Sequence, residues 1–376
     1  MVHIIYRHYE PGDDKQLADL FNTCFNFIRT PKSWNWRYVQ SPNFDPEMCQ
    51  IAEDSDNKKI VGAVYVNLVE EISIDGKKYL NGDINDVSCL PAYGRRGIAK
   101  NLMDMAIEYM KKRNCDISIL SADYNGFPRK KIYLKYGYLD IEREYFFINF
   151  GNLFQIAWDF PVIASFFPIT FMMSYISRFI NRIRVKSNPY FNNISCEIAN
   201  NKRHFEYLEA AKRILPKYYD VTQIYNNEKV SWSRIKVPGE SEMPTYIILR
   251  KDDEIIGGAL LTSITAYIKK GGFKIRMGLI HEVFIDKSKF DTKRNLYFGY
   301  TTLIDKVLKV ATRRYMGPLI FPSCAKDNDL HEAFRGMSFF KIKGGVLMMK
   351  PIKENIILPE AKKPIHVPTH TNIGFP

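Results

Sequence analysis

Apolar residues recur with a helical period after residue 97 of this 376-residue chain. They are spaced three and four residues apart, at Ile98, Leu102, Met105, Ala106, Tyr109 and Met110. Charged residues take the opposite positions, at Asp104, Glu108, Lys111 and Lys112. This spacing predicts an amphipathic helix that begins near Ile98. An apolar strand end precedes the helix, in a run that starts at Val87.

A short strand and a second helix follow along the chain. The apolar run Ile117–Ala122 predicts the strand. The second helix is predicted to have Pro128 at its start and Gly137 at its end. Proline suits the first turn of a helix, and glycine adopts the left-handed conformation that ends one.

A basic, glycine-containing turn joins the first strand to the first helix, and it reads Gly94, Arg95, Arg96 and Gly97. Backbone N–H groups at a helix start have no partner within the helix, and the helix dipole adds positive potential there. Glycine lets the backbone approach a ligand closely, and the two arginines add fixed charge. The turn therefore predicts a phosphate-binding site. The alternative is a surface turn whose Gly and Arg serve only capping and solubility.

The second half of the chain repeats the pattern of the first. The matched pairs are Trp36 with Trp232, Gly62 with Gly257, Val87 with Val283, and Tyr133 with Phe334. Their offset lies between 195 and 201 and is largest for the last pair. Loop insertions between two copies of one fold would produce such an offset.

The second copy lacks the candidate chemistry of the first. Residues 290–293 read Phe-Asp-Thr-Lys, so both glycines are missing and an acid stands where phosphate would sit. Phe334 takes the place of Tyr133, and Leu279 takes the place of Asp83. We therefore expect the second copy to be a structural or substrate-shaping domain that binds no coenzyme.

An uncharged, largely apolar stretch runs from Phe160 to Ser177 between the two copies. Four cations follow it, Arg178, Arg182, Arg184 and Lys186. A membrane-spanning helix needs about 20 apolar residues and disfavours the two internal prolines of this stretch. We expect a linker helix that packs across both domains. The alternative is contact with a membrane surface through residues 160–186, with the cations facing anionic headgroups.

Composition narrows the class of protein. With 46% hydrophobic and 14% aromatic residues, the chain can bury two cores of ordinary domain size. The formal net charge is +13, but Lys and Arg are spread along the chain, so a nucleic-acid partner is not expected. Six cysteines without a Cys-x-x-Cys pair predict neither a metal site nor disulfides. The N-terminus lacks the pattern of a signal peptide, so we expect a cytoplasmic protein, peripheral to a membrane in the alternative just given.

Two motifs of the first half resemble the GNAT acetyltransferase superfamily, whose loop Gln/Arg-x-x-Gly-x-Gly/Ala binds pyrophosphate and whose later helix ends in Tyr-x-x-x-Gly-Phe. The matching residues are Gly97 and Ala99 in the loop and Tyr133, Gly137 and Tyr138 at the helix end. The resemblance covers about residues 3–150. Two positions depart from it: Gly94 stands where Gln or Arg is expected, and Asn125 lies one residue further from Tyr133 than usual.

The resemblance implies an α/β fold with a mixed α+β sheet. Together with the repeat it predicts two tandem GNAT-like domains, the second of them degenerate. This arrangement is similar to that of the enhanced-intracellular-survival acetyltransferases without their third domain. The expected divisions are a catalytic, acyl-CoA-binding domain at 1–150, a linker at 151–189, a degenerate domain at 190–352 and a Pro-containing tail at 353–376.

The resemblance also implies direct transfer of an acetyl group from acetyl-CoA to a primary amine of a small molecule or a protein, without a metal. A non-catalytic acyl-CoA-binding or scaffold protein is the alternative, and the sequence leaves oligomerisation open. The residues expected to contact the coenzyme are Val87, Ser88, Cys89, Gly94, Arg95, Arg96, Gly97, Ile98, Ala99 and Asn125.

An acceptor ammonium must lose a proton before it attacks a thioester, so the reaction gains from a base. Asp83 is the first candidate, because several GNAT enzymes carry a strand glutamate at this position, and Asp86 is the second. Period-two alternation predicts that Asp83, Asn85 and Val87 share one strand face and that Asp86 faces the other way. Either acid could instead be a solvated strand-edge residue or a partner of Arg95.

Other groups are expected at the site from the resemblance alone. The family pattern implies that Tyr133 protonates or hydrogen-bonds the leaving sulfur. In the related N-myristoyltransferases the terminal carboxylate is the base, which makes the carboxylate of Pro376 a further candidate beside a bound water. Five prolines between Pro351 and Pro376 favour an extended tail that could reach the first site.

Overall fold

A computed structural model describes most of the chain. The described residues are 3–25, 29–150, 168–199, 204–223, 232, 244–268, 273–324, 326–358, 360 and 362–366.

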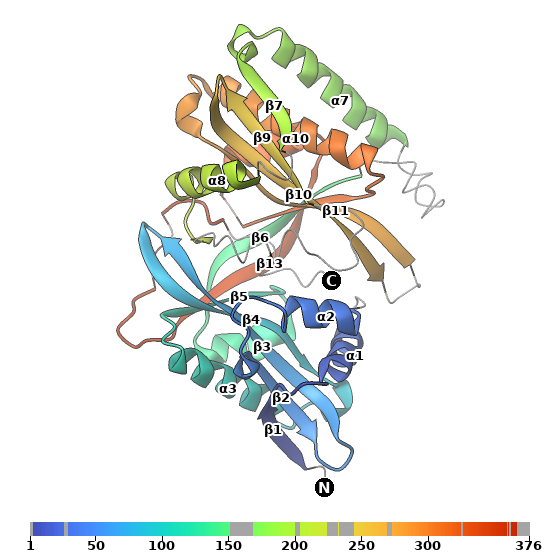
Figure 1. Ribbon diagram of the computed structural model, residues 1–376, viewed down its shortest axis with the longest axis vertical. Coiled ribbons are helices and arrows are strands. Elements are labelled where there is room, and N and C mark those ends of the chain that lie inside the picture. Colours follow the sequence, from blue (N-terminus) through green and yellow to red (C-terminus); the bar gives the residue numbers. More distant parts are fainter. Residues whose placement is uncertain are drawn as a thin grey trace.

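The described strands form one 13-stranded mixed sheet that runs through the whole molecule (Figure 1). The strands of the first half are β1 (Ile4–His8), β2 (Cys49–Asp54), β3 (Lys59–Ile74), β4 (Lys77–Cys89), β5 (Ile117–Ala122) and β6 (Leu139–Asn149). Those of the second half are β7 (Ile194–Ala199), β8 (Thr222–Gln223), β9 (Thr245–Lys251), β10 (Glu254–Ile268), β11 (Phe273–Ile285), β12 (Leu319–Ser323) and β13 (Phe340–Pro351). The predicted mixed α/β class is confirmed.

The strand order is the same when it is followed inward from either edge of the sheet. One half reads β1-β2-β3-β4-β5-β13, the other reads β7-β9-β10-β11-β12-β6, and β8 pairs with β3 off this path. The sixth place in each half is therefore taken by the last strand of the other half. β13 lies between β5 and β6, and β6 lies between β13 and β12. This exchange joins the halves through backbone hydrogen bonds, while their division into tandem domains stays a prediction.

Helices cover the sheet on both faces (Figure 1). In the first half they are α1 (Asp14–Cys24), α2 (Pro31–Arg37), α3 (Ile98–Lys112) and α4 (Phe127–Lys131). In the second half they are α7 (Pro168–Lys186), α8 (His204–Tyr218), α10 (Lys293–Arg313) and α11 (Asn328–Gly336). Short 3₁₀ turns are η1 (Pro46–Met48), η2 (Pro91–Tyr93), η3 (Tyr133–Tyr136), η4 (Pro189–Phe191) and η5 (Lys287–Lys289).

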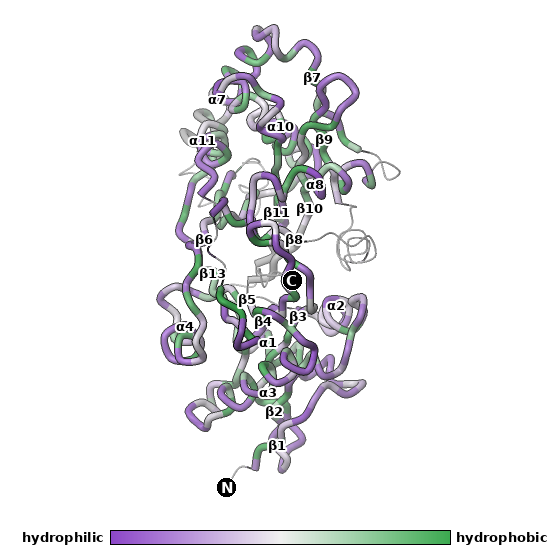
Figure 2. Tube along the Cα trace, turned by 90° about the vertical axis from the view of Figure 1, so that its left-hand side faces the viewer, coloured by the Kyte–Doolittle hydropathy of each residue, from purple (hydrophilic) through white to green (hydrophobic). Residues whose placement is uncertain are grey.

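Alternation along β9 shows how two helices share one strand. Ile247 and Leu249 belong to the core beneath α10, whereas Tyr246 and Ile248 belong to the core beneath α8. Successive side chains of a strand point to opposite faces, so both faces of this strand are buried. Figure 2 shows the same hydrophobic character along the central strands of the molecule, near β4, β5 and β13.

The local predictions around the first helix are confirmed. α3 begins at Ile98, and its predicted apolar face is buried except for Met105, which is partly exposed. β5 spans the predicted Ile117–Ala122. The prediction that Gly137 ends this segment is also correct, because Gly137 has φ +80 and caps the C-terminal end of η3.

The second predicted helix is wrong as a single continuous element. α4 ends at Lys131, and the chain continues as the 3₁₀ turn η3 after Ile132, whose φ is −118. Helix ends commonly tighten into a 3₁₀ turn, and the apolar spacing does not distinguish the two forms here.

Two distant parts of the chain also reach the boundary between the halves. The Trp232 ring stacks on that of Trp36 at 5.1 Å, and its Nε1 donates to the Trp36 carbonyl at 3.1 Å. These two tryptophans, matched as repeats, are thus in contact. In the tail, Ile365 is buried and bridges to Asp220, while residues 367–376 and the candidate carboxylate of Pro376 lie outside the described residues.

Candidate active site

β4 and β5 diverge in the middle of the first half. Their parallel pairing consists of Asn81 with Ile117, Gly82 with Ser118 and Asp83 with Ile119. β4 continues to Cys89 and β5 to Ala122 without further pairing between them. The sheet therefore splits after Asp83, leaving a place where a ligand can meet strand backbone.

A β-bulge bends β4 next to this split. Ala63 pairs with Ser88 and Tyr65 pairs with Asn85, so Asp86 and Val87 oppose a single residue of β3. Asp86 has φ +50, in the left-handed region. A bulge re-aims the strand and interrupts its alternation. The predicted face shared by Asp83, Asn85 and Val87 therefore holds only for the first two, whose side chains form a hydrogen bond.

The glycine–arginine turn after β4 presents unpaired backbone donors. Gly97 has φ +78 and Arg95 has φ +64, and both arginines are exposed. Within the described residues, the amides of residues 95–100 have no protein acceptor. No side chain caps α3 at Gly97. A helix start of this kind, with successive amides free, is a ready site for a phosphate group.

The equivalent corner of the second half is closed by its own side chains. Thr292 caps α10 by accepting from Asn295 N at 3.1 Å, and Asn295 Nδ2 donates to Asp291 at 2.7 Å. Because these side chains occupy one amide of the helix start and add a negative charge beside it, the geometry favours coenzyme binding in the first half.

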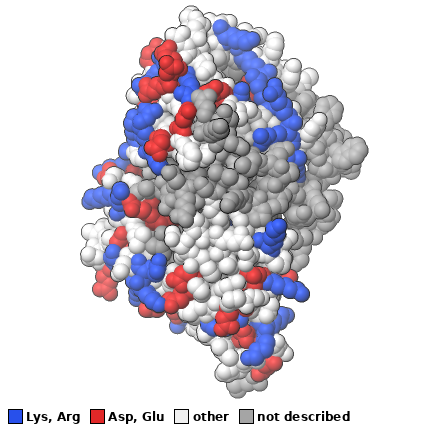
Figure 3. All heavy atoms as spheres, in the orientation of Figure 1, with Lys and Arg blue, Asp and Glu red and all other residues white. Residues whose placement is uncertain are grey.

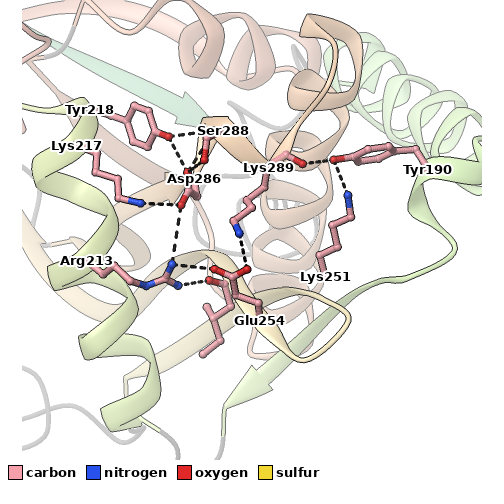
Figure 4. Close-up of polar contacts among 10 residues, drawn as sticks. Tyr190, Arg213, Lys217, Tyr218, Lys251, Glu254, Asp286, Ser288 and Lys289 are labelled. Atoms are coloured by element: carbon pink, nitrogen blue, oxygen red, sulfur yellow. Dashed lines mark hydrogen bonds and ion pairs between the residues drawn. The ribbon is translucent and has the colours of Figure 1, made fainter.

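A network of ion pairs further fills this second corner (Figure 4). Asp286, at the end of β11, accepts from Ser288 Oγ at 2.6 Å, Tyr218 Oη at 2.7 Å and Lys217 Nζ at 3.1 Å. Burial alone would raise the pKa of Asp286, but these three donors outweigh it and lower that pKa to about 2. Lys217 and Arg213 are thus paired with acids of the protein itself, Lys217 with Asp286 and Arg213 with Glu254 at 3.0 Å.

Asp83 lies at the fork of the split and is 2% exposed. Asn85 Nδ2 donates to its Oδ2 at 3.0 Å, while Oδ1 has no partner among the described residues. Burial raises the pKa of Asp83 well above its usual range, although the Asn85 hydrogen bond opposes the shift. A buried acid with one free oxygen and a raised pKa is a candidate for proton transfer.

Asp86, unlike Asp83, has two side-chain donors. One comes from the segment before α2 and the other from the residue that caps the end of α2. Its Oδ2 accepts from Arg29 Nη1 at 2.5 Å and also from the Tyr38 hydroxyl. Burial lowers the pKa of Arg29 to about 10, with the charge of Asp86 acting in the opposite direction. This carboxylate anchors buried Arg29, so the geometry favours Asp83 over Asp86 as a base.

Tyr133 begins η3 and is 6% exposed. Its hydroxyl has no hydrogen-bond partner among the described residues, whereas neighbouring Tyr138 bonds Ser118 Oγ at 2.8 Å. Burial raises the pKa of Tyr133, which keeps its proton available at neutral pH. Burial, Tyr133 and Asp83 all raise the pKa of Tyr138, so the three residues belong to one neighbourhood.

Comparisons with known proteins identify similar proteins for the first half of the chain. Residues 5–139 match the family model described as acetyltransferase (GNAT) domain. Residues 5–139 form a GNAT domain. A related protein is N-alpha-acetyltransferase 30 of Saccharomyces cerevisiae, 24% identical over 158 residues, which are 41% of this chain and 88% of that protein.

Solved structures share the fold over both halves. Saccharomyces cerevisiae N-myristoyltransferase with bound myristoyl-CoA matches with a TM-score of 0.67 at 12% identity, covering 97% of this chain and 89% of that one. A GCN5-related N-acetyltransferase from Anabaena variabilis matches with a TM-score of 0.58 at 12% identity, covering 93% and 73%. The fold around the GNAT domain is therefore that of GNAT-like proteins along nearly the whole chain.

The structure gathers most of the predicted site residues at one end of β4 in the GNAT domain. They comprise the β4 residues Asp83, Asp86, Val87, Ser88 and Cys89, and the turn and helix start Gly94, Arg95, Arg96, Gly97, Ile98 and Ala99. Tyr133 joins them through Tyr138. Asn125 lies in the exposed turn after β5, where its backbone N–H donates to Asp123.

A partly buried acid just beyond the GNAT domain was missed by sequence analysis. Glu144 on β6 bonds Ser121 Oγ and lies 3.6 Å from Cys324 Sγ of the second half. Burial raises the pKa of Glu144, and its charge raises that of Asp83. The sequence signal for Glu144 is an acidic residue inside the strand pattern 139–149. Its contact with Cys324 depends on the strand exchange, which the sequence pattern does not show. Among the described residues, no group of three His, Cys, Asp or Glu side chains could hold a metal.

Proposed function

We propose that this protein is an N-acyltransferase that moves an acetyl group from acetyl-CoA to a primary amine. The observation that carries this proposal is the run of unpaired amides at residues 95–100, beside the split between β4 and β5. The GNAT domain and the similarity to N-alpha-acetyltransferase 30 support acetyl transfer to an amine.

The donor would be held by backbone more than by side chains. The amides of residues 95–100 and the charges of Arg95 and Arg96 would bind its pyrophosphate. Beyond Asp83 neither β4 nor β5 pairs with the other, so backbone groups there are available to the amide-rich arm of the donor. Val87, in the bulge, would present its N–H toward the thioester oxygen.

Two side chains would move protons. An acceptor ammonium has a pKa of about 10.4, so releasing its proton at neutral pH costs roughly 4–5 kcal/mol without a base. Asp83 would take that proton, and the neutral nitrogen would attack the thioester carbonyl. The new C–N bond forms as the C–S bond breaks, and Tyr133 would protonate the leaving thiolate. The second proton that the nitrogen loses on becoming an amide would then return to the Tyr133 oxygen.

A thiol-release assay tests this proposal. The full chain is given acetyl-CoA and a panel of primary amines, which includes short peptides with free N-termini. We expect amine-dependent release of coenzyme A thiol and an acetylated product by mass spectrometry. Myristoyl-CoA is tested in parallel, because the structurally similar yeast enzyme was solved with that donor. Coenzyme binding without thiol release for every amine and donor would support the scaffold alternative instead.

A further inference from the structure

α7 is an amphipathic helix that faces its apolar side away from the protein. Six large apolar residues follow helical spacing and are 41–60% exposed, namely Met172, Tyr175, Ile176, Phe179, Ile180 and Ile183. A helix that packs on a globular protein normally buries such a stripe. Figure 1 shows α7 on the outside of the second half, at its far end.

The polar side of α7 holds the helix onto the protein. Arg182 makes two hydrogen bonds from Nε and one from Nη2 to Asp305 of α10, at 2.8–3.0 Å. Ser177 Oγ and Asn181 Nδ2 both donate to the Gly336 carbonyl at the end of α11. Arg178 lies 3.5 Å from Asp305 and is 14% exposed. These contacts fix the rotation of the helix, so the apolar stripe cannot turn inward without breaking them.

The charge around the stripe is strongly positive. α7 carries four cations and no acid, and α10 beside it carries five cations and one acid, Asp305. Arg184 and Lys186 are exposed and have no ion-pair partner among the described residues. Figure 3 shows Lys and Arg side chains in a row on the upper right of the molecule, where Figure 1 places α7.

We propose that α7 docks the protein onto an anionic lipid surface, with the helix lying along that surface. An exposed apolar stripe beside unpaired cations is the pattern of interfacial helices, since the stripe enters the headgroup boundary while the cations meet acidic lipids. Tyr175 supplies an aromatic group of the kind enriched at that depth, and Phe179 adds to the apolar face. With 19 residues the helix offers a contact roughly 28 Å long. In the described part of the chain no helix is long and apolar enough to cross a membrane.

A second copy of the chain is the competing occupant of the stripe. Charge argues against it, because two copies joined through α7 would bring together the exposed cations Arg184 and Lys186 of each helix, which have no ion-pair partner among the described residues. An acidic lipid surface instead complements that charge. This inference does not depend on the proposed transferase activity.

Vesicle flotation of the full chain tests the proposal. The probes are vesicles of phosphatidylcholine alone and of phosphatidylcholine with an equal part of phosphatidylserine. We expect the protein to float only with the acidic vesicles, and to float less when salt is raised from about 0.1 to about 1 M, which shortens the screening length. Absence of flotation with acidic vesicles at low salt would overturn the proposal.

Two triple variants separate the stripe from exposed apolar surface in general. Tyr175→Ser/Phe179→Ser/Ile183→Ser should reduce flotation at least about tenfold, because it removes apolar contact area. The matched control changes exposed apolar residues of 56–89% exposure elsewhere, as Phe127→Ser/Leu139→Ser/Ile357→Ser, and should float like the natural protein.

A variant without two of the exposed cations and a measurement of the oligomeric state complete the test. Arg184→Gln/Lys186→Gln should weaken flotation, with circular dichroism confirming that each variant is folded. Equal loss of flotation in both triple variants would contradict a specific docking face. A dimer in sedimentation analysis that the stripe variant converts to monomer would also overturn the lipid proposal, because the stripe would then be an interface between copies.

Discussion

Arg29 Nη1 lies 2.5 Å from Asp86 Oδ2, and this ion pair ties the segment before α2 to the bulge of β4. The Arg29 side chain is fully buried, its guanidinium lies 3.7 Å from the centre of the Phe21 ring, and its Nε and Nη2 have no partner among the described residues. The bulge that shapes the candidate site therefore depends on a buried charge that a single carboxylate neutralises.

Breaking this pair should destabilise the protein strongly. Asp86→Ala leaves a buried, unpaired guanidinium, so we expect the free energy of unfolding to fall by about 3–5 kcal/mol. Urea unfolding measures the change. The control is Glu71→Ala, which breaks the exposed pair with Lys78 and should cost at most about 1 kcal/mol. Similar losses in the two variants would mean that Asp86 is not an anchor.

Coenzyme A should bind one site per chain, at the turn before α3. Gly97→Asp places a negative charge where pyrophosphate would sit, and we expect binding in calorimetry to weaken by at least about tenfold, or about 1.4 kcal/mol. Gly76→Asp is the matched control, because Gly76 has φ +75 and no atom within 4 Å of an added Cβ, as does Gly97 at φ +78. Two sites per chain, or equal affinity in both variants, would contradict this assignment.

Tyr133→Phe should lower turnover without weakening coenzyme binding. The hydroxyl has no protein partner among the described residues, so its loss costs little stability, whereas a general acid contributes about 10²–10⁴-fold to rate. Steady-state kinetics with a saturating amine measures the effect. Tyr138→Phe removes a hydroxyl that bonds Ser118 and should leave turnover near that of the natural protein. Unchanged turnover in Tyr133→Phe would assign its hydroxyl no catalytic part.

Asp83 should control the acidic limb of the pH profile. Because burial raises its pKa, the folded protein keeps this proton to a higher pH than the unfolded chain, and kcat/KM should rise as the proton is lost. Asp83→Asn should remove that limb, and Asp83→Glu should restore it in part.

The stability of the same variants follows from linkage. Above the ordinary carboxyl pKa the folded state binds more protons than the unfolded one, so Asp83 reduces stability as pH rises through its raised pKa. Asp83→Asn should therefore be at least as stable as the natural protein at alkaline pH in urea unfolding. A large loss of stability there would make Asp83 a structural residue rather than a base.

The sequence by itself determined the elements whose signals are local. The stripe from Ile98 to Met110 predicted α3, the run Ile117–Ala122 predicted β5, and Gly97 and Gly137 took the left-handed conformations that their positions required. These features depend on side-chain period and backbone sterics within a few residues. The same signals placed Asp83 and the phosphate turn in neighbouring segments.

Only the tertiary structure decided features that join distant segments. The exchange of β6 and β13 between the halves is invisible to periodicity, because a strand pattern does not specify its pairing partner. The ion pair of Asp86 joins it to Arg29, which lies 57 residues away in the chain. The contact of Glu144 with Cys324 spans 180 residues.

The orientation of α7 is the clearest case. The sequence predicted a linker helix that packs across both domains, whereas the described contacts of the α7 polar side are with α10 and with the end of α11. Here Asp305 and the Gly336 carbonyl bind the polar side, and these groups come from 120 or more residues further along the chain. Side-chain spacing determined the two faces, and long-range hydrogen bonds and ion pairs determined which one meets the protein.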